Sequence, residues 1–410
     1  MKVSLIGTGM DGERSLTREA AQAICDAQLL IGASRMLAPY EQSGKQLADA
    51  WEYLEICDLL HDAQCGGCMQ AAILLSGDSG FYSGAKNLLP YLADYDVQVL
   101  PGISSLSYFC AKTGFSYEEM YIVSLHGRTN NIASHVKHHR LTFFLLGGKV
   151  NAAMLCQRLC GYGMADVTVH VGENLGTEKE TVTAGAAKDL TMLWTGNLTV
   201  AIVENPEALS FLPTGIPDEA FERVTAAGAA QGTKTIPMTK SEVRAVSVGK
   251  LQVQEDNICW DVGCGTGSVS VELALRAPAG FVYAFDRSEQ AAALTMRNAM
   301  KFGCDNLSAI CAEFPPEDAE SLAEPDCVFI GGAGGKCDKI IRLACSMNPA
   351  VRIVVTAVSL ETLAQAHAAL TEAFGVCSVT QLCVSRAEAV GRVSMLRAAN
   401  PVFILQGIPE

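Results

Sequence analysis

The sequence predicts two consecutive α/β domains, and three observations lead to this fold class. At 410 residues the chain is too long for one ordinary domain and suits two of about 200 residues each. Short apolar segments of strand length alternate with helical stretches along the whole chain. Several of these segments end in glycine-rich turns. The stretch from Glu204 to Asp218 holds three prolines and little periodicity, so we expect the domain boundary there.

The predicted strands follow one another at α/β spacing in both halves. In the first half, eight apolar segments have the length and composition of strands: Lys2–Ile6, Leu29–Ile31, Ala72–Leu75, Val97–Val99, Tyr121–Ser124, Leu141–Leu146, Val167–Val171 and Leu198–Val203. The second half begins with a helix and a glycine-rich turn, and its later strands are expected near 281–285, 308–311, 326–330, 351–355, 377–384 and 401–405.

Composition limits the possible partners. The net charge of −14 argues against nucleic acid, which requires a basic face, and a polyanionic substrate would need a local basic pocket. Although 49 % of the residues are hydrophobic, no apolar run approaches the roughly 18 residues of a membrane helix. The N-terminus leads straight into a predicted strand without the layout of a signal peptide, so we expect a cytoplasmic protein.

The cysteines and histidines favour no metal site. Sixteen cysteines are scattered, mostly within apolar segments, as expected of reduced, packed thiols. Cys65-Gly-Gly-Cys68 is the one C-x-x-C, and without a second pair or spaced histidines we expect free thiols there. His135 and His139 have a spacing of four that suits a metal ion, but no acidic third ligand lies beside them, so we expect a solvated helix face.

The most informative segment is residues 260–267, Trp-Asp-Val-Gly-Cys-Gly-Thr-Gly. It places an acidic residue at the end of a predicted strand, Ile258–Val262, and then three glycines at alternate positions before a helix, Ser268–Arg276. The next apolar strand, Phe281–Phe285, ends in Asp286. Glycines allow a tight turn and close approach of a ligand, and an acidic residue at the second strand's tip can accept hydrogen bonds from a ribose diol. The pattern therefore indicates a βαβ nucleoside pocket.

The spacing of the glycines favours S-adenosylmethionine over a dinucleotide. The dinucleotide fingerprint is G-x-G-x-x-G, and Ser268 occupies the position of its last glycine. Without that glycine, a nicotinamide oxidoreductase is less favoured than a cofactor with ribose and adenine but no pyrophosphate. The residues of this pattern expected at the cofactor are Asp261, Gly263, Gly265, Gly267 and Asp286.

Three further segments of the second half are placed to support this pocket. Thr239 can cap the helix that precedes the turn, with Glu242 completing a capping box. The acidic-aromatic-proline turn at 313–316 is expected against the adenine. Phe329-Ile-Gly-Gly-Ala-Gly-Gly ends another strand, and its four glycines indicate that something large approaches the backbone.

Four motifs resemble the C15-methylating, decarboxylating enzymes of corrin (cobalamin) biosynthesis. They are Gly215-Ile-Pro-Asp-Glu-Ala-Phe, Met238-Thr-Lys-Ser-Glu-Val-Arg, Asp261-Val-Gly-Cys-Gly-Thr-Gly-Ser-Val-Ser and Phe329-Ile-Gly-Gly-Ala-Gly-Gly, in that order within residues 212–410. The resemblance implies a Rossmann-like class I methyltransferase domain that self-associates. It also implies S-adenosylmethionine contacts at Thr239, Gly263 to Gly267, Asp286 and Phe314.

The first half carries five polar or glycine-rich turns at predicted strand ends. They are Ile6-Gly-Thr-Gly-Met-Asp-Gly, Leu75-Ser-Gly-Asp-Ser-Gly-Phe-Tyr-Ser-Gly, Leu100-Pro-Gly-Ile-Ser-Ser, Ser124-Leu-His-Gly-Arg and Val171-Gly-Glu-Asn-Leu-Gly. Any one of them is an ordinary loop, but five together indicate a ligand crevice.

These turns resemble the tetrapyrrole methylases, in particular the C5-methylating corrin enzymes, over residues 1–208. The resemblance implies a two-lobed fold with the substrate near Gly9, His126 and Arg128. It implies S-adenosylmethionine contacts at Gly77, Asp78, Gly80, Phe81, Ser104, Ser105, Leu146 and Thr199.

The two resemblances together imply methylation of a corrin precursor at C5 and C15, with loss of CO₂ from the C12 acetate. The ring carbons are enamine-like nucleophiles, so catalysis requires mainly alignment and exclusion of water. Substrate carboxylates require basic residues, for which the candidates are His126, Arg128, Lys240 and Arg244. Two alternatives stay open: the first half is a non-catalytic substrate holder, or the acceptor is another molecule. Whether cobalt is already in the ring also stays open.

Overall fold

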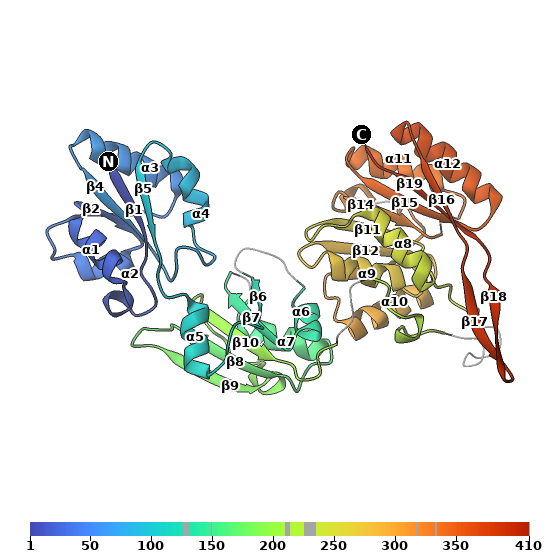
Figure 1. Cartoon of the computed structure of the whole chain (residues 1–410), viewed down its shortest axis with the longest axis horizontal. Helices are drawn as coiled ribbons and strands as arrows, with labels where there is room; N and C mark the ends of the chain where they lie inside the picture. Colours follow the sequence, from blue (N-terminus) through green and yellow to red (C-terminus); the bar gives the residue numbers. More distant parts are fainter. Residues whose placement is uncertain are drawn as a thin grey trace. The chain divides into compact units, whose positions relative to one another are not determined.

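The computed structural model describes residues 1–125, 131–148, 150–209, 214–224, 235–316, 319–332 and 334–409, with the side chains of 320 and 390 left out. The chain divides into two compact units, and Figure 1 labels most of their helices and strands. The first comprises the described residues of Met1–Gly127, Leu141–Gln157 and Asp166–Glu204. The second comprises those of Arg128–Arg140, Arg158–Ala165 and Asn205–Glu410.

The first sheet of the first unit is parallel and covered on both faces. Its strand order is β3-β2-β4-β1-β5. Separate clusters of buried side chains on its two faces explain why its central strands are apolar at nearly every position. The strands are β1 (Lys2–Gly7), β2 (Leu29–Gly32), β3 (Gln46–Asp49), β4 (Gln70–Leu75) and β5 (Asp96–Leu100). The helices are α1 (Arg18–Asp26), α2 (Ser34–Leu37), α3 (Tyr53–Cys65) and α4 (Ala85–Leu88).

The second sheet of the first unit is mostly antiparallel, with the order β6-β7-β10-β8-β9. A helix packs closely on it because Gly172 lacks a side chain: a β-carbon there would lie 2.7 Å from the Phe109 ring. The strands are β6 (Tyr121–Ser124), β7 (Leu141–Leu146), β8 (Thr168–Glu173), β9 (Thr181–Ala186) and β10 (Thr199–Glu204). The helices are α5 (Ser105–Thr113) and α7 (Ala152–Gly161).

The second unit is built on a seven-stranded, mostly parallel sheet of order β13-β12-β11-β14-β15-β19-β16. The order reverses between β11 and β14, and open sheets bind ligands at the carboxyl ends of strands at such a point. The parallel strands are β11 (Ile258–Val262), β12 (Phe281–Asp286), β13 (Leu307–Cys311), β14 (Cys327–Ile330) and β15 (Arg352–Ala357). The strands β16 (Ser378–Leu382) and β19 (Val402–Gly407) complete the sheet, and β19 is antiparallel to both its neighbours.

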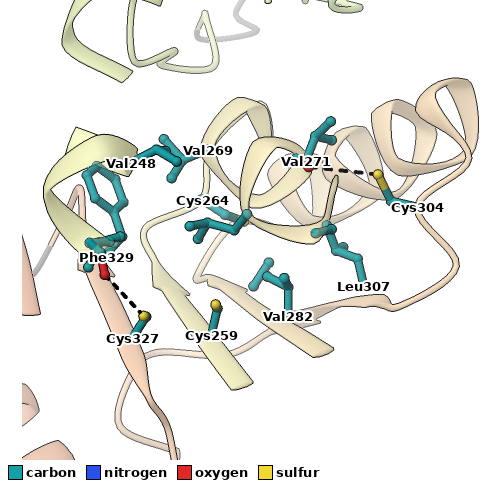
Figure 2. Packing of buried hydrophobic residues seen from close by; sticks show 14 of the residues in the cluster. Val248, Cys259, Cys264, Val269, Val271, Val282, Cys304, Leu307, Cys327 and Phe329 are labelled. Carbon is teal, nitrogen blue, oxygen red and sulfur yellow. Dashed lines mark hydrogen bonds between the residues drawn. The ribbon is translucent and has the colours of Figure 1, made fainter. Parts of the chain in front are cut away.

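Helices cover both faces of this sheet. Buried residues of α8 (Ser241–Leu251), α9 (Ser268–Arg276) and α10 (Glu289–Phe302) form one core with one face. Buried residues of α11 (Cys337–Met347) and α12 (Leu360–Phe374) form another core with the opposite face. Figure 2 shows the first of these cores, where Cys259, Cys264, Cys304 and Cys327 pack among valines as small apolar residues. All sixteen cysteines, each among the described residues, are free thiols.

Four strands lie outside the sequence prediction. Two are β3 and β9, and two form the hairpin of β17 (Ser385–Val390) and β18 (Val393–Ala398). The turn of the hairpin is Gly391-Arg392, with Gly391 at φ +64°. Both hairpin strands are exposed, so they lack the alternation of buried and exposed residues that identifies a strand in sequence.

The helix α6 (Ile132–His138) also differs from expectation, because it packs within the second unit. His135 is buried, and burial lowers its pKa to about 3, so the prediction of a solvated helix face is wrong. Asn131 Nδ2 donates to Asn306 Oδ1 over 2.9 Å, and the Asp305 backbone N–H donates to Asn131 Oδ1 over 3.0 Å. These contacts join α6 to the residues that follow α10. No helix among the described residues is long and apolar enough to cross a membrane.

Candidate functional site

The carboxyl end of β11 carries a buried acid whose hydrogen bonds are incomplete. Asp261 is fully buried, and its Oδ2 accepts a hydrogen bond from the Ser270 hydroxyl of α9. Its Oδ1 is buried and has no hydrogen-bond partner among the described residues. Burial raises the pKa of Asp261 to about 7, and the charge of Asp286 adds to the rise. A buried acceptor without a donor is the kind of group that a ligand can satisfy.

Asp261 predicts a pH dependence of stability. Its pKa of about 7 in the folded chain lies above the ordinary 3.8, so its contribution to stability is present below about pH 4 and lost as the pH rises through 7. At 1.36 kcal/mol per unit, the free energy of unfolding of the second unit falls by up to about 4 kcal/mol over this range. Asp261→Asn cannot ionise and is expected to flatten the decline, measured by urea unfolding at several pH values. Equal slopes in variant and wild type would contradict it.

The glycine turn after β11 is required by packing of the protein against itself. Gly263 has φ +81°, and a β-carbon there would lie 2.7 Å from the backbone nitrogen of Gly332. Gly265 has φ +56°, and its β-carbon would lie 2.4 Å from the carbonyl oxygen of Pro237. The turn is therefore held between two other loops, which is a stronger structural reason for glycine than the ligand approach expected from the sequence.

The other residues of the turn are also placed by these contacts. Thr266 donates its backbone N–H to the Pro237 carbonyl over 3.2 Å, and its buried hydroxyl has no partner among the described residues. Cys264 is buried and accepts a hydrogen bond from the Thr295 hydroxyl over 3.3 Å. Gly267, at φ +75°, is the N-cap of α9.

Asp286 is fixed beside this turn. Its Oδ2 accepts the Gly265 backbone N–H over 3.0 Å, and its Oδ1 accepts the Ser288 backbone N–H over 2.9 Å. A carboxylate offers about four acceptor positions, so two bonds leave capacity for the hydroxyls of a ribose. The glycine turn thus orients the Asp286 carboxylate, which is expected to bind the ribose of a ligand held by the same turn.

The helix before the turn begins differently from the prediction. The N-cap of α8 is Lys240, which makes no side-chain capping bond, so the predicted capping box of Thr239 and Glu242 is wrong. Asp218 supplies the capping acceptor instead, because its Oδ1 accepts the Ser241 backbone N–H over 3.0 Å. Thr239 still lies at the turn through its carbonyl, which accepts the Ser268 hydroxyl over 3.4 Å.

Arg244 lies in a buried ionic network and not on a substrate-binding surface. Its Nε donates to Glu272 Oε1 over 2.6 Å, its Nη1 donates to the Thr239 carbonyl over 2.6 Å, and its Nη2 donates to the Ile216 carbonyl. The guanidinium also lies 4.9 Å from the centre of the Phe221 ring. With no exposed surface, Arg244 holds the segment before α8 and is not proposed to bind a substrate carboxylate.

Two other cations near the N-terminus of α8 remain accessible. The Lys240 side chain is 43 % exposed, and its Nζ lies 3.5 Å from Asp218 Oδ2. Arg386 of β17 reaches the same carboxylate over 3.4 Å and pairs with Glu242. Sequence analysis missed Arg386, because nothing in its local sequence indicates that the hairpin brings it to α8.

The loops after β13 and β14 have different contacts. The Phe314 ring is 5 % exposed and packs edge-on against Trp260 and Phe285, at 5.4 and 4.7 Å between centres, so it supports the core. Gly331 and Gly332 both donate backbone N–H groups to the Val262 carbonyl, over 2.9 and 3.2 Å. Lys336, which the sequence analysis did not single out, pairs with Glu313 over 3.0 Å and links these two loops.

In the first unit, the turns at the carboxyl ends of β1, β4 and β5 meet. Asp78 Oδ1 accepts the Gly80 N–H over 2.7 Å, and its Oδ2 accepts the Gly102 N–H over 3.0 Å. Gly9 and Gly77 exchange two backbone hydrogen bonds of 2.9 and 3.1 Å. Gly77 has φ +68°, and a β-carbon there would meet nothing closer than 3.9 Å, so this turn has an open side.

The remaining residues expected from the first half of the sequence lie on a helix, on two strands and in a loop, and two of them lie outside the described residues. Ser104 is the N-cap of α5 and accepts the Ser107 N–H over 3.1 Å, and Ser105 is the first residue of that helix. Leu146 and Thr199 are buried partners in the register of β7 and β10. The Phe81 ring lies 6.2 Å from the Phe143 ring of β7. His126 and Arg128 lie outside the described residues.

Comparison with known protein families matches both halves of the chain. Residues 2–191 match the tetrapyrrole (corrin/porphyrin) methylases, and residues 233–407 match the precorrin methyltransferase domain. A probable cobalt-precorrin-6B C(15)-methyltransferase (decarboxylating) of Pyrobaculum calidifontis is 43 % identical over 192 residues, which are 47 % of this chain and 94 % of that protein.

One curated relative extends over both halves. The precorrin-6Y C(5,15)-methyltransferase [decarboxylating] of a Sinorhizobium species is 28 % identical over an alignment 410 positions long, which covers 98 % of this chain and 94 % of that protein. Among solved structures, a precorrin-6Y C5,15-methyltransferase of Geobacter metallireducens is 34 % identical, with a TM-score of 0.41, and covers 48 % of this chain and 97 % of its own.

Proposed function

The chain belongs to the family of decarboxylating precorrin methyltransferases, and we propose that it methylates one corrin precursor at C5 with its first half and at C15 with its second, releasing CO₂ from the C12 acetate. The observation that carries this proposal is the presence of two separate strand-end sites in one chain, around Asp78 and around Asp286. Each site lies within a different family match, and a relative covering both halves bears the name of both methylations.

The second site fits S-adenosylmethionine. The orphaned Oδ1 of Asp261 and the oriented carboxylate of Asp286 suit a ligand that carries hydroxyls and a cationic group. When bound, S-adenosylmethionine supplies an electrophilic methyl group. Asp286 holds the ribose in this proposal, and the turn forms the wall of the pocket together with the Thr239 backbone. In this proposal the domain is a Rossmann-like class I methyltransferase. Phe314 packs on Trp260 and Phe285 and forms the wall of the pocket on the side of the adenine. The contacts proposed here are Thr239, Asp261, Gly263, Cys264, Gly265, Thr266, Gly267, Asp286 and Phe314.

The first site fits the same cofactor through its backbone. Asp78 ties the loop after β4 to the loop after β5, which leaves the open side of Gly77 as a cradle. A two-lobed tetrapyrrole-methylase domain of residues 1–208 is proposed to bind S-adenosylmethionine there, and residues 212–410 form the second domain. The contacts proposed here are Gly77, Asp78, Gly80, Phe81, Ser104, Ser105, Leu146 and Thr199.

The corrin substrate requires positions for its carboxylates. Lys240 is proposed to hold one of them in the C15 reaction, because its side chain is 43 % exposed and it follows Thr239, whose carbonyl accepts the Ser268 hydroxyl at the end of the glycine turn. His126 and Arg128 are proposed for the C5 reaction. These residues thereby bind and orient the corrin ring, and none of them has to act as a strong base. We also propose a cytoplasmic location. Self-association through the second domain is proposed as well, and light scattering of the purified protein tests it.

Mass spectrometry of a reaction with the purified full chain, S-adenosylmethionine and the corrin precursor tests this function. The precursor is offered with and without cobalt. Gain of two methyl groups with loss of one CO₂ is expected with one of the two forms. Gain of one methyl with loss of CO₂ would leave the first half as a substrate holder. No change with either form would overturn the corrin assignment, and the acceptor would be another molecule.

A further inference from the structure

The loop after β4 is held in one conformation by several independent contacts. The two carboxylate oxygens of Asp78 accept backbone N–H groups from Gly80 and Gly102. The Ser79 hydroxyl donates to the Leu100 carbonyl over 3.0 Å, and the Phe81 N–H donates to the Asp78 carbonyl over 3.3 Å. A loop determined this strongly can hold a neighbouring residue in an unfavourable backbone conformation.

Tyr82 is that residue. Its φ of +48° lies in the left-handed region, which an aromatic residue adopts only at a cost in free energy. The other described non-glycine residues with positive φ are Asn174 and Gln252, and of these asparagine tolerates the region and Gln252 is the C-cap of α8. The Tyr82 side chain is 52 % exposed, so burial of its ring does not offset this cost.

The exposed Tyr82 ring packs against its neighbour in the loop. The Phe81 ring lies 6.2 Å from the Phe143 ring and meets the Tyr82 ring at 5.1 Å and 89°, so Phe81 links the Tyr82 ring to the second sheet. The Ile103 carbonyl lies 3.9 Å from the position of a β-carbon on Gly77, and Ile103 is 42 % exposed. The Met10 sulfur lies 4.0 Å from the same position. The open side of Gly77 is thus bordered by one backbone carbonyl and one thioether.

We propose that Tyr82 is the positioning residue against which the conjugated face of the tetrapyrrole packs during methylation by the first half. A tetrapyrrole has flat apolar faces and charged edges, and a half-exposed phenol ring offers a rigid face that contributes to binding through area and geometry. The strained backbone of Tyr82 fixes the direction of the phenol ring before the substrate binds. The tetrapyrrole that packs on this phenol ring then has its C5 carbon aligned for attack. This inference rests on the proposed C5 methylation.

Three variants of the full-length protein test the role of the ring. Tyr82→Gly removes both the ring and the strain, Tyr82→Ala removes the ring alone, and Tyr82→Phe keeps the ring. Tyr91→Ala is the matched control, because Tyr91 is also half exposed but lies in a 3₁₀ turn and stacks on Tyr53 of α3. The substrate is the form of the precursor that wild type consumes, and the C5-methylated product is measured by chromatography and mass spectrometry.

The expected result is a KM for the tetrapyrrole raised about 10-fold in the glycine and alanine variants and within twofold of wild type in Tyr82→Phe and Tyr91→Ala. The Kd for S-adenosylmethionine, measured by calorimetry, is expected to stay unchanged in all four. A wild-type KM in Tyr82→Gly would overturn the inference and show that the residue only shapes the loop. A weakened Kd for S-adenosylmethionine in that variant would also overturn it. Absence of C5 methylation in the wild type would refute the proposed function itself.

Discussion

Asp286→Ala is expected to lower C15 methylation and decarboxylation by about 100-fold and to leave C5 methylation at the wild-type rate. Asp286 accepts backbone N–H groups from Gly265 and Ser288, and we propose that its remaining acceptor positions hold the ribose of the cofactor. Loss of hydrogen bonds to a charged acceptor costs about 3 kcal/mol, which corresponds to roughly 100-fold in binding or rate. Product mass spectrometry separates the two reactions, because the variant is expected to accumulate a product with one added methyl group and no loss of CO₂.

The matched variant is Asp78→Ala in the first unit. Asp78 makes the corresponding pair of backbone contacts, to Gly80 and Gly102, and its loss is expected to reduce C5 methylation selectively. If either variant lowered the rates of C5 and C15 methylation equally, the two reactions would not take place at independent sites. Asp286→Asn tests the charge, because the amide keeps one acceptor for the turn and loses the anionic acceptors for the diol.

The sequence was sufficient to predict the elements that position the second site. The strand Ile258–Val262 and the helix Ser268–Arg276 have the predicted bounds, because a buried parallel strand followed by a glycine turn is a strong local pattern. Asp261 and Asp286 could be placed beside the turn for the same reason. What local sequence could not show is that the glycines of the turn pack against Gly332 and Pro237, which are distant along the chain.

The elements that the sequence did not reveal depend on distant partners. The capping of α8 by Asp218 requires a carboxylate 23 residues earlier, so a local capping box was the wrong interpretation. Arg386 reaches α8 from a hairpin whose two strands are exposed and therefore lack a periodic signature. Arg244 has the same sequence appearance as a surface cation, and only the fold shows that it is buried. Local propensity determines where the helices and strands form, and tertiary contacts of this kind then determine which partners each side chain has.

Arg244 is nevertheless expected to have a large effect on stability. Its guanidinium is buried and pairs with Glu272 over 2.6 Å and with Asp218 over 3.4 Å. Arg244→Met keeps the length of the side chain and leaves the buried carboxylate of Glu272 without its cation, while Asp218 keeps Lys240 and Arg386. Removing one partner of a buried ion pair costs about 3–5 kcal/mol, because the remaining charge is desolvated and uncompensated. The free energy of unfolding of the second unit is therefore expected to fall by that amount.

Urea unfolding followed by the fluorescence of Trp260 measures this change. Trp51 and Trp194 are exposed, so replacing both with phenylalanine leaves Trp260 in β11 as the one tryptophan of the chain. Arg342→Met is the control, because its pair with Glu372 is 67 % exposed on both sides and is expected to contribute less than about 1 kcal/mol. Equal destabilisation by the two variants would show that the Arg244 pair is no more important than a surface pair.

A second substitution separates charge from packing. Glu272 also accepts backbone N–H groups from Gly215 and Ile216, over 3.1 and 3.0 Å, and a glutamine can keep one of these bonds through its carbonyl. In the Arg244→Met background, Glu272→Gln removes an uncompensated buried charge and is expected to restore part of the lost stability, even though it is destabilising in wild type. A sign reversal of this kind arises only when the cost lies in the unpaired charge. The segment before α8 and the glycine turn after β11 would then share one electrostatic support, since the Arg244 guanidinium also holds the Thr239 carbonyl, which accepts the Ser268 hydroxyl at that turn.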